Sequence, residues 1–125
     1  MKIFGHPWID SKKFYQVTTK EEINQTPPNS ILLLKELKDS IELALYCQKN
    51  SLEYAVRVDS IKDAIFANEL DAKFIISNPK NTITIQPIAQ NYLFDSEILA
   101  IIEKEEEIEN LAQKGIDGVI FKKEL

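Results

Sequence analysis

Short apolar runs alternate with longer amphipathic segments along most of this chain. The runs ILLL, YAVRV, FII, ILAII and VIF are too short for buried helices, and their β-branched and aromatic residues favour strands covered on both faces. Between these runs, apolar residues recur at helical spacing in residues 41–49, 61–70 and 104–114. This alternation predicts βα units around a parallel sheet, with right-handed crossovers.

Three pairs of residues have the spacing of a capping box, in which a small polar side chain precedes an acidic residue at the third helical position. The pairs are Thr19 with Glu22, Asp39 with Glu42, and Ser60 with Asp63. The first helix is expected to end by Thr26, because two prolines follow. The residues expected to face inward are Ile41, Ala44, Leu45 and Cys47 in the second helix, Ile61, Ala64, Ile65 and Leu70 in the third, and Ile108, Leu111 and Ala112 in the last.

Residues 78–92 are the hardest segment to interpret. Pro79 and Pro87 bracket the sequence TITI, whose β-branched residues favour extended chain, although the alternation calls for a helix here. We expect a loop and then a helix that has Pro87 near its first turn and runs to about Tyr92. Gly115 is expected to end the last helix in the left-handed conformation.

The length and the pattern together predict one α/β domain covering residues 1–125, with residues 1–12 as an N-terminal arm. The expected architecture is an open parallel sheet of five to six strands flanked by helices, a three-layer sandwich of flavodoxin-like or Rossmann-like type. The alternative is half of a (β/α)8 barrel, because a full barrel needs eight units.

Composition excludes several functional classes. The net charge is −5, and the lysines are dispersed among glutamates, so neither nucleic acid nor an anionic membrane is expected as a partner. With three glycines the chain has no glycine-rich phosphate loop, and neither a flavin nor any other cofactor is expected. The lone Cys47 indicates a buried thiol and no disulfide or zinc site. Because no signal peptide or membrane-spanning run is recognisable, a cytoplasmic location is expected.

Two segments of the chain resemble each other: ANELDAKFIIS and AQKGIDGVIFK. Each is a helix end, a small or turning residue, and a short apolar strand that ends in a polar group. This pattern resembles the successive units of phosphate-binding (β/α)8 barrels, and residues 52–121 look broadly like part of a class I aldolase barrel acting on keto-deoxy sugar acids. The resemblance implies a Schiff-base lysine that points into the barrel from a strand. Lys122 and Lys123 follow the last expected strand, outside the sequence context of that lysine.

Arg57 is the only arginine in the chain, and it lies in an apolar strand. Ligands of parallel α/β sheets bind at the carboxyl ends of the strands, where Arg57 would act as a bidentate clamp for a small anion. The candidate ligand-binding residues are Arg57, Asp59, Asn78, Glu103 and His6. In the competing interpretation, Arg57 forms a structural ion pair with Asp59, Glu36 or Glu103. His6 has no second ligand nearby in the sequence, so no metal site is expected, and no catalytic residue is identified.

Three functional hypotheses follow. The first is a non-catalytic binding or self-association module, present as a homo-oligomer or bound to a protein partner. The second is a small-molecule binder or lyase-like enzyme that uses Arg57 on an anionic sugar phosphate or keto acid. The third is a receiver-like signalling domain phosphorylated on Asp59, which stands just past the strand that ends at Val58.

Overall fold

The computed structural model describes all 125 residues, and its centre is a seven-stranded parallel sheet. Along the sheet the strands have the order β1-β7-β6-β5-β4-β3-β2, and every neighbouring pair is parallel. The strands are β1 (Lys2–Phe4), β2 (Phe14–Gln16), β3 (Ile31–Glu36), β4 (Tyr54–Arg57), β5 (Phe74–Ser77), β6 (Glu97–Ile102) and β7 (Gly118–Phe121).

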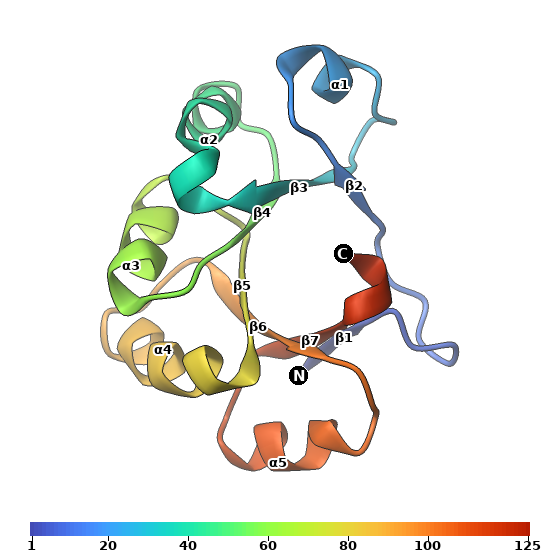
Figure 1. The fold of residues 1–125 in the computed structure, drawn as a ribbon, viewed down its shortest axis with the longest axis vertical. Coiled ribbons are helices and arrows are strands. Elements are labelled where there is room, and N and C mark those ends of the chain that lie inside the picture. The colour runs from blue at the N-terminus through green and yellow to red at the C-terminus, as the bar shows by residue number, and fades with distance from the viewer.

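The sheet curls until its two edge strands, β1 and β2, approach each other (Figure 1). No backbone pairing joins these strands, but the rings of Phe4 on β1 and Phe14 on β2 pack edge to face with their centroids 5.1 Å apart. Both rings also pack on Phe74 of β5, at 5.3 and 5.8 Å. The sheet is therefore an incompletely closed barrel, and these three aromatic rings meet in its interior.

The predicted α/β class and the parallel sheet flanked by helices are confirmed. The sheet has seven strands where five to six were expected, because the start of the predicted N-terminal arm forms β1 and pairs with β7. Its curl fits the half-barrel alternative. The strand order runs along the sheet without the reversal of a flavodoxin-like fold, and the helices α2 to α5 lie on the outside of the curl (Figure 1).

The chain also contains five α-helices and two short 3₁₀ turns, of which the second follows the last strand. They are α1 (Lys20–Asn24), η1 (Leu37–Asp39), α2 (Ile41–Lys49), α3 (Ile61–Glu69), α4 (Pro79–Asn91), α5 (Glu107–Gln113) and η2 (Lys122–Glu124). None of the helices combines the length and the apolar composition needed to cross a lipid bilayer.

Two of the three predicted helix caps are confirmed. Thr19 accepts a hydrogen bond from the backbone N–H of Glu22, and Ser60 accepts one from the N–H of Asp63. The cap predicted at Asp39 is wrong, because this residue belongs to η1, and α2 begins after Ser40 without a side-chain cap. Gly115 has the expected left-handed backbone, with φ of 73°.

The prediction for residues 78–92 is wrong in its first half, since TITI is helical and α4 begins at Pro79. Asn78 caps this helix by accepting a hydrogen bond from Asn81 N–H, and Pro79 occupies a first-turn position where no N–H is needed. Thr82 is buried and bonds to Ser77 and to the carbonyl of Asn78. Local capping and packing thus override the β-branched preference, and Pro87 lies inside the helix.

Side chains alternate between the two faces of each strand, which divides the core into an interior and an outer layer. The interior of the curl holds eight buried residues, namely Phe4, Ile31, Leu33, Ala55, Phe74, Ile76, Leu99 and Ile120. The outer layer packs against the helices and includes Leu32, Leu34, Tyr54, Val56 and Ile75. On β4, Ala55 faces the interior, so a residue two positions away along this strand faces the interior as well.

Several residues predicted to face inward from the helices are exposed instead. Ile41 and Leu45 in α2 are 41% and 49% exposed, and Ile61 and Ile65 in α3 are 38% and 41% exposed. Ala112 is also exposed. The small residues Ala44, Cys47, Ala64 and Ala67 face the sheet. The helices approach the sheet closely along these small residues, so the larger aliphatic side chains lie on their flanks.

Candidate binding site at the strand ends

A cavity of about 540 Å³ lies at the carboxyl ends of the strands. We call it the mouth cavity. Its polar lining residues are Gln16, Thr18, Lys35, Glu36, Asp39, Arg57 and Lys122, and its apolar ones are Val17, Leu33, Leu34, Ile101 and Leu125. They come from the ends of β2, β3, β4 and β6 and from the turns that follow β3 and β7. The cavity volume falls within the range of roughly 300–1,000 Å³ that is typical of small-molecule sites.

Arg57 reaches the mouth cavity because of its position on β4. Ala55, two residues earlier, belongs to the interior cluster, and strand alternation places Arg57 on the same face one step closer to the carboxyl end. The side chain is exposed, although Val56 and Val58 on either side of it are buried. The strand therefore holds the guanidinium at the rim of the interior.

The predicted structural ion pair of Arg57 is absent, which corrects that interpretation. Arg57 takes part in no ion pair, although it was expected to pair with Asp59, Glu36 or Glu103. Each of these three carboxylates forms an ion pair with a lysine instead.

Lys38 lies 3.1 Å from Asp59 and 3.7 Å from Glu36, and Lys122 lies 3.4 Å from Glu103. The hydrogen bond to Asp59, together with the charges of Asp59 and Glu36, raises the pKa of Lys38. The guanidinium of Arg57 keeps its donors available, and a carboxylate or phosphate accepts from them in bidentate fashion.

A β-bulge brings two consecutive charged residues of β3 to the mouth cavity. Leu33 pairs with Ala55 and Glu36 pairs with Arg57, so β3 contains one residue more than β4 over this interval. A bulge redirects side chains relative to regular alternation. As a result, Lys35 and Glu36 both line the cavity, and Lys35 forms no ion pair.

Beneath these charged groups the cavity is apolar. Leu125, which follows η2, packs against the interior cluster and lines the cavity together with Leu33 and Ile101. Thr18 lies at the edge, where its hydroxyl donates to Glu22 at 2.6 Å. This bond and others from Thr18 and Thr19 lower the pKa of Glu22. The arrangement suits a ligand with an anionic group and a partly apolar body.

The other predicted site residues do not line the mouth cavity. Asp59 and Glu103 are paired with lysines and are half or more exposed. Asn78 caps α4. Ser77, which also ends a strand, points outward and bonds to Thr82. Of the five candidates, the structure places only Arg57 in the cavity.

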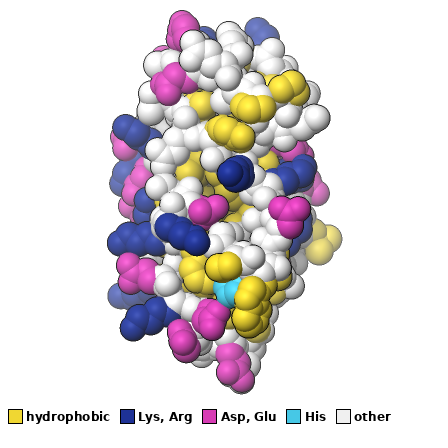
Figure 2. All heavy atoms as spheres, turned by 90° about the vertical axis from the view of Figure 1, so that its right-hand side faces the viewer, with side chains coloured by type: hydrophobic (Ala, Val, Ile, Leu, Met, Phe, Trp, Pro, Cys, Tyr) yellow, Lys and Arg dark blue, Asp and Glu magenta, His cyan; other side chains and the backbone are white.

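His6 follows β1, and both of its ring nitrogens are engaged. Nδ1 accepts a hydrogen bond from Trp8 N–H at 3.1 Å, so we assign the proton to Nε2, which donates to Glu105 at 2.7 Å. The ring also packs against Trp8 and Phe121. In Figure 2 the histidine lies beside an acidic and several hydrophobic side chains. His6 thus ties the β1–β2 connection to the loop between β6 and α5.

The structure contains no group of side chains arranged as a metal centre, and its one thiol is buried. No three His, Cys, Asp or Glu side chains come together as metal ligands. Cys47 is buried on the side of α2 that faces the sheet, and this burial raises the pKa of its thiol to about 11. Burial also raises the pKa of Tyr54, whose hydroxyl donates to the carbonyl of Leu70 at 2.6 Å.

Gln16 and Asp39 are two polar residues of the mouth cavity that were not among the predicted site residues. Gln16 was detectable in principle, because it has the same parity on β2 as Phe14, which packs against the interior. The sequence analysis assigned Asp39 to a helix cap. In the structure it lies in the 3₁₀ turn η1, and no local sequence pattern predicted this turn.

Comparison with protein-family models finds no match for this chain. A comparison with curated proteins finds no similar sequence either.

Proposed function

We propose that this protein is a non-catalytic binding module whose mouth cavity takes a small anionic metabolite, such as a sugar phosphate or a keto acid. The observation that carries the proposal is the unpaired guanidinium of Arg57 at the rim of a cavity with an apolar base. Lys35 adds a second cation without an ion-pair partner. A cytoplasmic location, where such metabolites are abundant, belongs to the same proposal.

The charges around the cavity favour an anion over a cation. The lining has three cations, Lys35, Arg57 and Lys122, and two carboxylates, Glu36 and Asp39. Lys122 pairs with Glu103, whereas Arg57 and Lys35 have no ion-pair partner. A hydrogen bond between charged groups contributes roughly 1.5–3 kcal/mol, so loss of the guanidinium weakens binding by about tenfold or more.

A thermal-shift screen of sugar phosphates and keto acids tests this function. A ligand that binds the folded state raises the melting temperature of the wild-type protein. Arg57→Ala is expected to reduce the shift at the same ligand concentration, as a tenfold weaker affinity requires, and Lys62→Ala, which removes an exposed cation from α3, is expected to retain it. An unchanged shift in the Arg57→Ala variant contradicts the assignment of Arg57 as the anion clamp.

A second candidate function is self-association through the outer sides of α2 and α3. The helices α2 and α3 are neighbours on the outside of the curl (Figure 1). Both expose apolar side chains, namely Ile41, Leu45, Ile61, Ile65 and Phe66. Ile41 and Leu45 are four residues apart on α2, and Ile61 and Ile65 are four apart on α3, so each pair shares one side of its helix. Exposed apolar surface is typical of interfaces where it is continuous. We propose a second copy of this chain as the occupant.

Sedimentation analysis tests self-association independently of ligand binding. The wild-type protein is expected to form a dimer at micromolar concentration, and Ile65→Asp is expected to return it to a monomer. Lys104→Ala, in the loop between β6 and α5 and outside α2 and α3, serves as the control. A wild-type protein that remains a strict monomer contradicts this second function.

A further inference from the structure

A second cavity, of about 410 Å³, lies at the opposite end of the curled sheet from the mouth cavity. We call it the basal cavity. Its apolar wall includes Phe4 of β1, Ile31 of β3, Phe74 of β5 and Ile9 from the β1–β2 connection. Ile31 and Phe74 are the first residues of their strands, which places the cavity at the amino ends. None of its lining residues lines the mouth cavity.

The aromatic side chains form part of the apolar wall of the basal cavity. Phe4 and Phe74 are 6% and 1% exposed, and their rings pack edge to face with centroids 5.3 Å apart. The ammonium groups of Lys2 and Lys73 lie 5.4 and 5.8 Å from the centroid of the Phe74 ring. Both cations are therefore close enough to the ring for cation–π attraction.

Three lysines, Lys2, Lys12 and Lys73, surround this apolar wall, and Asp10 is the only acidic residue that lines the cavity. Their carboxylate partners hold them from outside, because neither Glu53 nor Glu97 lines the cavity.

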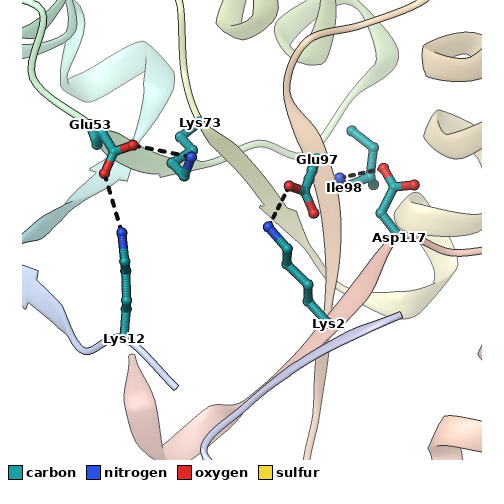
Figure 3. A network of polar contacts seen from close by, with 7 residues as sticks. All are labelled: Lys2, Lys12, Glu53, Lys73, Glu97, Ile98 and Asp117. Carbon is teal, nitrogen blue, oxygen red and sulfur yellow. Dashed lines mark hydrogen bonds and ion pairs between the residues drawn. The ribbon is translucent and has the colours of Figure 1, made fainter. Parts of the chain in front are cut away.

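Figure 3 shows this arrangement of ion pairs. Lys2 is 2.7 Å from Glu97, whereas Glu53 is shared between Lys73 at 3.1 Å and Lys12 at 3.9 Å. The pair of Lys12 is thus the longest of the three.

An ammonium group has three N–H donors, so each lysine retains donors after it meets one carboxylate oxygen. Lys12 is the least restrained, because its ion pair is long and its side chain is 62% exposed. An anion that enters the cavity can therefore form an ion pair with Lys12 while Lys2 and Lys73 keep their shorter ion pairs with Glu97 and Glu53. The aromatic or branched aliphatic part of such a ligand would pack against the wall formed by Phe74 and Ile9.

We propose that the basal cavity is a second ligand site, for a small carboxylate with an aromatic or branched apolar body. The apolar part packs on Phe4, Phe74 and Ile9, and the carboxylate accepts hydrogen bonds from Lys12 and its neighbouring lysines. The volume lies near the lower end of the range typical of organic ligands, which favours a ligand with a single ring or a short chain. This site does not depend on the anion proposed for the mouth cavity.

NMR titration of the full chain with phenylacetate tests the proposal. Phenylacetate is expected to cause saturable shifts in the backbone amides of Lys2, residues 9–12, Lys73 and Phe74. The neutral analogue 2-phenylethanol is expected to bind about tenfold more weakly, because it lacks the charge-assisted hydrogen bonds. Saturation below roughly 10 mM is expected, which corresponds to an ordinary affinity for a ligand of this size.

Two substitutions on exposed neighbouring lysines separate the carboxylate contact from general charge effects. Lys12→Gln is expected to weaken phenylacetate about tenfold, and Lys13→Gln, which removes the same charge outside the cavity, is expected to change nothing. Their spectra report directly that both variants are folded. Arg57→Ala is expected to leave these shifts intact.

Four results overturn the proposal. The first three are the absence of any shift at the basal amides, equal binding of phenylacetate and 2-phenylethanol, and equal effects of Lys12→Gln and Lys13→Gln. Shifts confined to the amides of Gln16, Lys35 and Arg57 also overturn it, since they would place phenylacetate in the mouth cavity.

Discussion

The contact between Phe4 and Phe14 offers a direct test of the curled sheet. These residues lie on β1 and β2, the two edge strands, which are six strand spacings apart along the sheet. In a flat sheet, at about 4.8 Å per spacing, they would be roughly 29 Å apart and energetically independent. In the curled sheet their ring centroids are 5.1 Å apart with an interplanar angle of 69°.

The expected coupling follows from this geometry. Edge-to-face aromatic pairs at centroid separations of about 4.5–7 Å contribute roughly 0.5–1.5 kcal/mol beyond their buried area. Phe4→Leu and Phe14→Leu should each destabilise the protein, and the double variant should lose less stability than the sum of the two, by about 1 kcal/mol. Residues without a shared contact add to within roughly 0.3–0.5 kcal/mol, so the coupling is measurable.

The assay is urea unfolding of the wild-type protein, the two single variants and the double variant. A matched cycle combines Phe4→Leu with Phe66→Leu, since Phe66 is a half-exposed phenylalanine on the outer face of α3. This control cycle should show no coupling. Additive effects of Phe4→Leu and Phe14→Leu would refute the inference that the edge strands meet across the interior.

Three further predictions concern other parts of the molecule. Gly118→Ala should destabilise the protein by about 2 kcal/mol in thermal unfolding, because the added Cβ would lie 2.7 Å from Leu99 Cδ2 and 2.8 Å from the Lys2 carbonyl oxygen. Full stability of this variant would contradict the close approach of β1, β6 and β7. Cys47 should react with a thiol reagent at pH 8 only as the protein unfolds, since burial raises its pKa to about 11, and rapid labelling of the native state would refute its burial. Thr18→Val should raise the pKa of Glu22, measured by NMR, towards the ordinary value of 4.5. Because the Glu22 pKa is lowered in the folded state, the contacts of Glu22 stabilise the protein at pH values above 4.5, and this stabilisation is lost as the pH falls through the folded pKa. An unchanged Glu22 pKa in the variant would contradict the hydrogen bond from Thr18.

The features that the sequence predicted correctly are those encoded in local residues. The apolar runs identified β3 to β7, and the spacing of Ser60 and Asp63 identified the start of α3, because caps and strand cores depend on adjacent side chains. Arg57 was located at a strand end for the same reason.

The features that were missed depend on contacts between distant segments. The curl of the sheet depends on Phe4, Phe14 and Phe74 packing together, and α4 depends on the fit of Thr82 against Ser77. The pairing of Asp59 with Lys38, which leaves Arg57 without a partner, is a competition between side chains that only the folded geometry decides. The β3 bulge that brings Lys35 and Glu36 together has no sequence signal either.

The central functional claim is that Arg57 is free to bind an anion in the mouth cavity. Because Arg57 is the only arginine, its Nε–H gives a single arginine side-chain signal in the NMR spectrum of the protein. Titration with an anionic ligand from the thermal-shift screen should move this signal to saturation in step with the amides of Gln16 and Lys35. An Arg57 signal that stays in place while a ligand saturates the protein would contradict the claim.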